Sequence, residues 1–132
     1  MLELPEVEVL RRDLEKEVVG KKIKAVEAKS MAALSRYKNR KSFTSLLVDV
    51  KIINVTRKGV YLLVGLDNAH TLVVDLGNGF MRKLTGKERD VPPAEITFTL
   101  AQSGLLIYVM TGPGGNFFVA TTEALGQEWP VV

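Results

Sequence analysis

The stretch VYLLVGLDNAHTLVVDLGNGFMRKL at residues 60–84 contains three apolar runs separated by two turn sequences. The runs at 60–66, 71–76 and 79–84 have the six or seven residues that are typical of a β-strand. DNAH and GNG supply the Asp, Asn and Gly that tight turns favour, and we expect positive φ at Gly77 and Gly79. These features predict consecutive antiparallel strands.

The same pattern continues on both sides of this stretch. Further strands are predicted at about 51–57, 95–100, 105–110 and 117–121, with TGPGG at 111–115 as a flexible hairpin loop. KKIKAVEAK at 21–29 is predicted as another strand, with Ile23, Ala25 and Glu27 on one face. So many short strands with close turn signals are typical of an antiparallel sandwich or barrel.

Two helices complete the predicted elements. Residues 5–19 have Pro5 in the first turn, Glu6 and Glu8 near the positive helix end, and Gly20 as the stop. Their apolar residues recur at helical spacing: Val7, Leu10, Leu14 and Val18. A shorter helix is predicted over 42–50, capped by Ser42, with an apolar face of Phe43, Leu46 and Leu47.

Length and composition narrow the class of protein. The 132 residues predict one domain with a real hydrophobic core. The chain has no cysteine, which excludes a thiolate zinc site within it, and its one histidine, His70, is expected to be an exposed turn residue; no metal site or other cofactor is predicted. It has neither an apolar run of membrane-spanning length nor a signal sequence, so we expect no membrane contact and a cytoplasmic location.

Charge is distributed unevenly along the chain. Residues 1–58 carry 14 Lys/Arg and 8 Asp/Glu, a net of +6, whereas residues 59–132 carry 4 and 7, a net of −3. A basic half suits a polyanion such as nucleic acid, although a solvated lysine-rich surface explains the same excess. TGPGGN at 111–116 lacks the following Lys-Ser/Thr of a phosphate-binding loop. The chain ends at EWPVV, and we expect this end to be a domain boundary within a longer protein.

Four segments in this order resemble the N-terminal domain of the formamidopyrimidine-DNA glycosylase and endonuclease VIII family: ELPEVE (3–8), VVGKKI (18–23), TRKGVYLLVGL (56–66) and TLVVDLG (71–77). The resemblance covers the whole chain and is weak beyond about residue 85. It implies a mainly β (α+β) fold, a two-sheet antiparallel β-sandwich with an N-terminal helix and a second short flanking helix. The chain is then a single domain over 1–132, without the helical DNA-binding domain and zinc finger of full-length members.

The resemblance also implies an activity and a partner. Family members bind double-stranded DNA with damaged bases or abasic sites, excise oxidised bases and cut the strand. Their nucleophile is an N-terminal proline amine, which attacks the sugar C1′ to form a Schiff base. An adjacent glutamate moves protons. Glu3 matches that glutamate, and Glu6 matches the second glutamate of the motif.

Several positions depart from the family pattern. Leu2 stands where the proline should be, so Met1 is expected to stay on and the amine to be displaced by one residue, about 3.5 Å of chain. Val60 replaces the hairpin lysine; Lys58 and Arg57 are the neighbouring candidates for DNA contact, Lys58 being expected on the same strand face as Val60. Asn78 replaces the wedge methionine, and Asp75 the preceding histidine. The Arg-Phe loop aligns with Gly114, Gly115 and Asn116.

Three functions stay open at this point. The first is a glycosylase/lyase domain, active or impaired by the departures at Leu2, Val60 and Asn78. The second is a non-catalytic domain that binds damaged DNA, and the third is a protein-interaction domain that retains the fold. Each retained residue also has a structural explanation, since Glu3 fits a solvated carboxylate, Glu6 a first-turn helix stabiliser and Lys58 an exposed strand residue.

Overall fold

The computed structural model describes residues 4–34, 36–85, 87, 93–101, 104–112 and 114–123. Its elements, in chain order, are α1 (Leu4–Val18), β1 (Ile23–Ala28), α2 (Arg40–Thr44), β2 (Ile52–Lys58), β3 (Tyr61–Leu66), β4 (His70–Asp75), β5 (Gly79–Leu84), β6 (Ile96–Leu100), β7 (Leu105–Met110) and β8 (Asn116–Thr121). The predicted positions of the N-terminal helix and of the strands are confirmed, because alternating apolar residues and turn sequences mark them locally.

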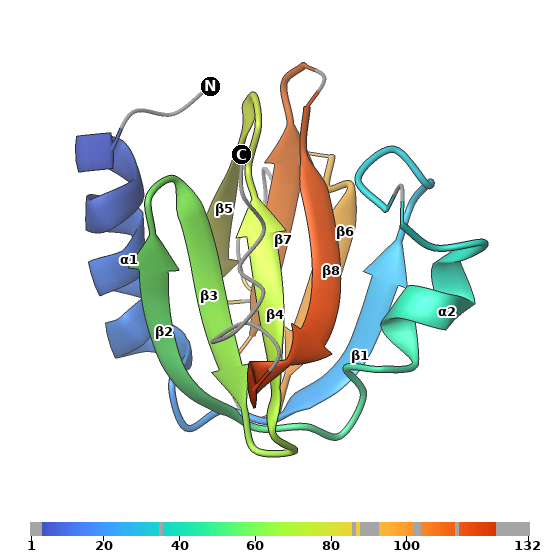
Figure 1. The fold of residues 1–132 in the computed structure, drawn as a ribbon, viewed down its shortest axis with the longest axis horizontal. Coiled ribbons are helices and arrows are strands. Elements are labelled where there is room, and N and C mark those ends of the chain that lie inside the picture. Colours follow the sequence, from blue (N-terminus) through green and yellow to red (C-terminus); the bar gives the residue numbers. More distant parts are fainter. Residues whose placement is uncertain are drawn as a thin grey trace.

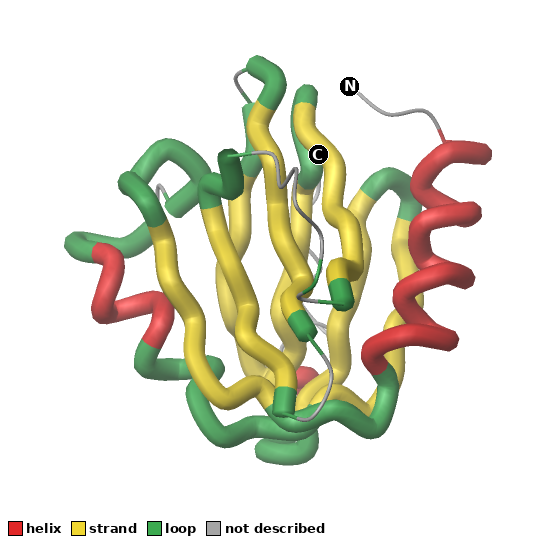
Figure 2. Tube along the Cα trace, turned by 180° about the vertical axis from the view of Figure 1, so that it is seen from behind, coloured by secondary structure: helices red, strands yellow, loops and turns green. Residues whose placement is uncertain are grey.

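The strands form two four-stranded antiparallel sheets, in the orders β1-β6-β7-β5 and β2-β3-β4-β8. The sheets pack face to face as a sandwich, with α1 beside β2 and α2 beside β1 (Figure 1). The view from behind shows the two helices at opposite sides of the sandwich (Figure 2). This confirms the predicted two-sheet β-sandwich and excludes the closed barrel. Neither of the helices in the described ranges is long and apolar enough to span a membrane.

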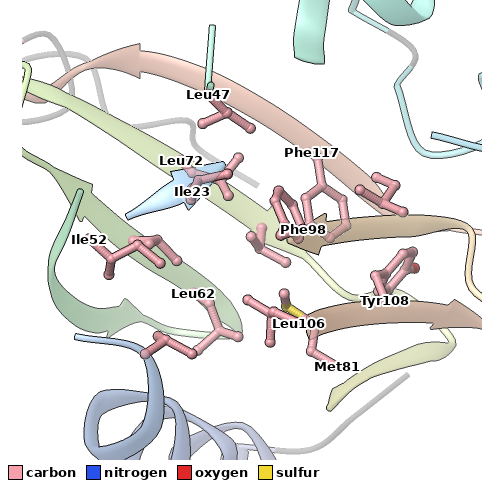
Figure 3. Packing of buried hydrophobic residues seen from close by; sticks show 14 of the residues in the cluster. Ile23, Leu47, Ile52, Leu62, Leu72, Met81, Phe98, Leu106, Tyr108 and Phe117 are labelled. Carbon is pink, nitrogen blue, oxygen red and sulfur yellow. The ribbon is translucent and has the colours of Figure 1, made fainter. Parts of the chain in front are cut away.

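Buried side chains from both sheets fill the space between them. Figure 3 shows Phe98, Tyr108 and Leu106 of one sheet facing Leu62, Leu72 and Phe117 of the other. The rings of Tyr108 and Phe117 meet edge to face, with centroids 4.8 Å apart. Val7, Leu14 and Val18 bury the apolar side of α1 against the same core. The core therefore spans both sheets and holds α1 on the sandwich.

The short helix differs from its prediction over 42–50. Its N-cap is Asn39, whose Oδ1 accepts a hydrogen bond from the Ser42 backbone N–H at 2.8 Å, so Ser42 lies inside the helix. Asparagine is among the strongest N-caps, which explains the earlier start. The helix ends at Thr44, and Leu46 is exposed while Phe43 and Leu47 are buried. Irregular turns, with Asp49 at φ 65°, lead on to β2.

β1 also differs from the simple alternation that was predicted. Ile23 and Ala28 are buried, whereas Ala25 and Glu27 are exposed. The register against β6 shifts between Ile23 and Ala25, and such a bulge turns the following side chains to the other face. The expected common face of Ile23, Ala25 and Glu27 is therefore wrong.

TGPGG does not form a hairpin loop. β7 and β8 belong to different sheets, so residues 111–115 connect one layer of the sandwich to the other. Residues 76–78 make the corresponding crossing between β4 and β5. The prediction was wrong because turn residues indicate where the chain reverses, and not which strand the next one pairs with.

Candidate DNA-binding rim

Four chain segments meet at one end of the sandwich, here called the rim. They are the first two turns of α1, the β2–β3 turn at Gly59 and Val60, the β4–β5 connection at 76–78, and the described part of the β7–β8 connection at 111–115. The strand register places them together, since Tyr61 pairs with Asp75, Asp75 with Asn116, and Gly79 with Met110. Figure 1 shows these connections at its upper end, beside the start of α1.

The predicted catalytic residues Met1, Leu2 and Glu3 lie outside the described residues, so their roles stay predictions. The helix that follows them begins at Leu4, and Glu6 is exposed in its first turn. The chain thus enters α1 at the rim. Glu6 is at the positive end of the helix, as predicted.

Glu8 is the centre of a charged cluster that was not predicted. Its Oε1 accepts from Arg57 Nε at 2.7 Å and from Arg11 Nε at 3.1 Å. Its Oε2 accepts from Arg11 Nη2 at 2.8 Å and from Arg12 Nε at 2.9 Å. Glu8, Arg11, Arg57 and Thr56 line a shallow depression at this side of the rim.

These contacts hold Glu8 in its charged form. Hydrogen bonds from Arg11, and then from Arg57, keep the pKa of the Glu8 carboxyl far below its usual range, against a smaller opposing effect of desolvation. The carboxylate in turn raises the pKa of Arg11. Glu8 is therefore an ionised hydrogen-bond acceptor at neutral pH, and it is not a proton donor.

Arg57 and Lys58, both predicted to contact DNA, occupy different environments. Arg57 is engaged within the protein, because it also donates from Nη1 to the Gly59 carbonyl at 3.1 Å. Lys58 is exposed at the end of β2, opposite Tyr61. The expectation that Lys58 and Val60 share a strand face is wrong: the chain reverses at Gly59, where φ is 63°, and Val60 lies in the turn.

The two connections that cross between the sheets pack against each other. A Cβ atom on Gly77, which has φ 55°, would lie 2.4 Å from the Gly114 backbone, and one on Gly115 would lie 2.0 Å from the Tyr108 hydroxyl. That hydroxyl donates to the Leu76 carbonyl at 2.7 Å, and burial raises the pKa of Tyr108 to about 12. Gly79 lacks the expected positive φ, but a Cβ there would meet Val109 and Tyr108.

Asn78 is exposed in the first of these connections. Its carbonyl accepts from the Thr111 backbone N–H at 3.1 Å and also from the Thr111 hydroxyl. The structure therefore brings Asn78 together with the glycine-rich connection that follows β7. The part of the rim that these two connections form has small or polar residues, namely Asn78, Gly112, Gly114 and Gly115.

The remaining candidates lie away from the rim. His70 lies at the opposite end as the half-buried first residue of β4, paired with Thr121, and not as the exposed turn residue that was expected. Its Nδ1 lies 2.9 Å from the Asn68 carbonyl oxygen. Lys21, Lys22 and Lys51 line another shallow depression there, so the basic residues of the first half do not gather at one site. Within the described ranges, no three His, Asp or Glu side chains are grouped as a metal site would need.

Sequence reasoning missed Glu8 and Tyr108 for different reasons. The spacing of Glu8, Arg11 and Arg12 gives i,i+3 and i,i+4 pairs on one helix face, a signal that was available. The contact of Glu8 with Arg57 joins residues 49 positions apart and depends on how α1 packs on β2. Nothing local to Tyr108 indicated that Gly79 of β5 and Gly115 of the β7–β8 connection would lie against its ring.

Known proteins with similar sequences are formamidopyrimidine-DNA glycosylases. Residues 1–111 match the formamidopyrimidine-DNA glycosylase N-terminal domain. The chain is 34% identical to the formamidopyrimidine-DNA glycosylase of Rickettsia bellii over 130 residues, covering 98% of this chain and 47% of that protein. It is 40% identical to the enzyme of Mycolicibacterium smegmatis over 111 residues, covering 83% of this chain and 38% of that protein. The chain thus spans about half the length of these curated relatives, or less.

A solved structure shows the same fold bound to DNA. The Lactococcus lactis Fpg in complex with abasic-site DNA superimposes with a TM-score of 0.83 and 29% identity, covering 94% of this chain and 46% of that one. Its complex with FAPY-dG-containing DNA gives a TM-score of 0.82. This chain belongs to the formamidopyrimidine-DNA glycosylase N-terminal domain family.

Proposed function

We propose that this chain is the N-terminal, catalytic-type domain of a base-excision-repair DNA glycosylase and abasic-site lyase for oxidised bases, with its catalysis impaired. The observation that supports the proposal most is the rim, which gathers the start of α1 and three strand connections in a fold that superimposes on Fpg bound to abasic DNA. The partner is double-stranded DNA with a damaged base or abasic site, and the location is the cytoplasm or nucleoid.

The proposed chemistry needs an amine and an acid at the rim. An unprotonated N-terminal amine attacks C1′ of the damaged nucleotide and displaces the base, and the resulting Schiff base allows β-elimination. Glu3 moves protons between the sugar and the leaving base. This chemistry requires no cofactor, and a zinc finger of the family would belong to a part outside residues 1–132.

Impairment follows from the position of the amine. Leucine after Met1 blocks the removal of the initiator methionine, because the processing enzyme cuts before small residues. The retained amine of Met1 is then displaced by about 3.5 Å of chain. A misplacement of about 1 Å already costs roughly a hundredfold in rate. Val60, in place of the family lysine, removes a cation from the β2–β3 turn.

A direct test is borohydride trapping on an abasic-site duplex. An imine between the chain and the sugar is reduced to a stable covalent adduct, so a slow but measurable adduct supports an impaired lyase. Mass spectrometry of the adduct then locates the linked amine at residue 1. A chain that binds the duplex and never forms the adduct has no lyase chemistry.

The second candidate is a non-catalytic domain that binds damaged DNA, and the replacements at Leu2, Val60 and Asn78 favour it. It predicts tighter binding to an abasic duplex than to the intact duplex, with affinity falling as salt is raised. Binding that ignores salt would count against both DNA functions. A protein partner whose capture is unaffected by competing DNA would favour the remaining alternative, an interaction domain.

A further inference from the structure

The Glu8 cluster joins the two elements that carry the candidate residues of the rim. On one side is α1, whose first turns follow directly from the N-terminal segment with Met1 and Glu3. On the other side is the β2–β3 turn, with Lys58 before it and Val60 within it. Arg57 bridges them, because its Nε donates to Glu8 and its Nη1 to the Gly59 carbonyl.

Arg11 adds a second link between the same elements. It donates from Nε and Nη2 to Glu8, and from Nη1 to the Val55 carbonyl of β2 at 3.3 Å. Glu8, Arg11 and Arg57 are partly buried, with side-chain exposures of 24%, 20% and 31%. Charge-assisted hydrogen bonds in such sites are directional as well as strong.

Apolar packing already attaches α1 to the sandwich. Val7, Leu14 and Val18 are buried in the shared core. Packing of this kind is non-directional, so it tolerates small rotations and shifts of the helix. The carboxylate and its guanidinium partners, by contrast, fix one orientation of α1 against the turn. The cluster therefore defines the orientation of α1 more narrowly than apolar burial alone does.

We propose that Glu8 is a positioning residue, which fixes the first two turns of α1, the helix that directly follows Met1 and Glu3 in the sequence, against the β2–β3 turn. Glu8 touches no reacting atom and acts through Arg11 and Arg57. The consequence for the reaction rests on the proposed function. The fixing of α1 against the β2–β3 turn does not rest on the proposed function, so this structural effect and its effect on the reaction can be tested separately.

The test compares Glu8→Gln with Glu15→Gln. The first keeps the shape of the side chain and removes its charge. The second removes a carboxylate of the same helix that is 52% exposed and lies 3.4 Å from Arg11. Amide hydrogen exchange measures both elements. Glu8→Gln should speed exchange at Lys58 and Tyr61, which pair across the turn, by about tenfold or more and leave β6 and β7 unchanged. Glu15→Gln should leave all of these sites unchanged.

A second variant tests whether faster exchange in Glu8→Gln reflects the lost contact or a general loss of folding. Arg57→Lys keeps the positive charge, but a lysine lacks the fork that reaches Glu8 and the Gly59 carbonyl together. It should reproduce the local increase in exchange at the turn. Unchanged exchange in both Glu8→Gln and Arg57→Lys would overturn the proposal, and so would an equal increase throughout the chain, which indicates lower overall stability.

The DNA readout separates positioning from binding. On saturating abasic duplex, Glu8→Gln should lower the borohydride trapping rate by about tenfold while the Kd stays within about threefold, since orientation is lost and affinity is kept. Glu8→Asp, which restores the charge, should recover part of the rate. A loss in Kd with an unchanged rate would contradict positioning. If the unaltered chain neither binds nor traps DNA, the proposed function fails, and the exchange experiment alone decides whether Glu8 fixes the turn.

Discussion

Glu8 is expected to make the stability of the domain depend on pH in the acid range. Its folded-state pKa lies far below the ordinary value near 4.5, so its contribution is complete above about pH 5 and is lost progressively as the pH falls below about 4.5. The difference in free energy of unfolding between the unaltered chain and Glu8→Gln should therefore shrink on acidification. Urea unfolding from about pH 7 to about pH 3 measures it. A difference that stays constant down to about pH 3 would show that the carboxylate is not held in this way.

Arg57 and Lys58 should respond differently when DNA binding is measured against salt. Removing a cation that binds one phosphate reduces the magnitude of the log–log slope by about 0.9. Lys58→Gln should show this reduction, because Lys58 is exposed at the rim. Arg57→Gln should leave the slope nearly unchanged, because its guanidinium is engaged by Glu8 and Gly59. The opposite ranking would mean that Arg57 leaves Glu8 to contact phosphate.

At the scale of elements, the two connections between the sheets should behave as one packed unit. Gly115→Ala forces a methyl group against the Tyr108 hydroxyl, and such overpacking costs about 1–3 kcal/mol. Tyr108→Phe removes both that oxygen and its bond to Leu76, at about 1 kcal/mol. In the double variant the alanine should therefore cost less than it does alone. Chemical denaturation of all four proteins gives the coupling energy.

Gly112→Ala is the matched control in the same connection. Its Cβ would lie 3.2 Å from the side chain of Asn78, which is exposed and can give way. This substitution should cost less than Gly115→Ala and show no coupling to Tyr108→Phe. Strictly additive effects of Gly115→Ala and Tyr108→Phe would mean that the packing around Tyr108 does not join the connections.

The sequence allowed most elements to be located, because local features define them. The run Tyr61–Leu66 and the turn DNAH are recognisable without any knowledge of their partners. Features set by distant contacts were not predictable: that β5 pairs with β7, and that a bulge near Ala25 turns β1. The Asn39 cap of α2 is a local feature that was missed, although asparagine is a strong N-cap. The candidate site divides in the same way, since Glu8 and Arg11 share a helix face whereas Arg57 reaches them only through the fold.

For the molecule as a whole, the retained fold and the altered rim lead to different expectations. The overall fold superimposes closely on the Lactococcus lactis Fpg domain. The departures at Leu2, Val60 and Asn78 fall at positions to which the resemblance assigns chemistry or entry into DNA, and the proposed impairment rests on them. Such a pattern favours the proposed function, in which the domain keeps its fold and binds DNA at the rim but has a lower catalytic rate.

The position of the N-terminal amine is the feature on which this interpretation depends most. Leu2→Pro places a small residue after Met1, so removal of Met1 exposes a proline amine at the family position; intact mass confirms the processing. Borohydride trapping rates on the same abasic duplex should then rise by about a hundredfold or more over those of the unaltered chain, with little change in Kd. Equal trapping rates for the two proteins, at equal DNA occupancy, would contradict the claim that a displaced amine limits catalysis.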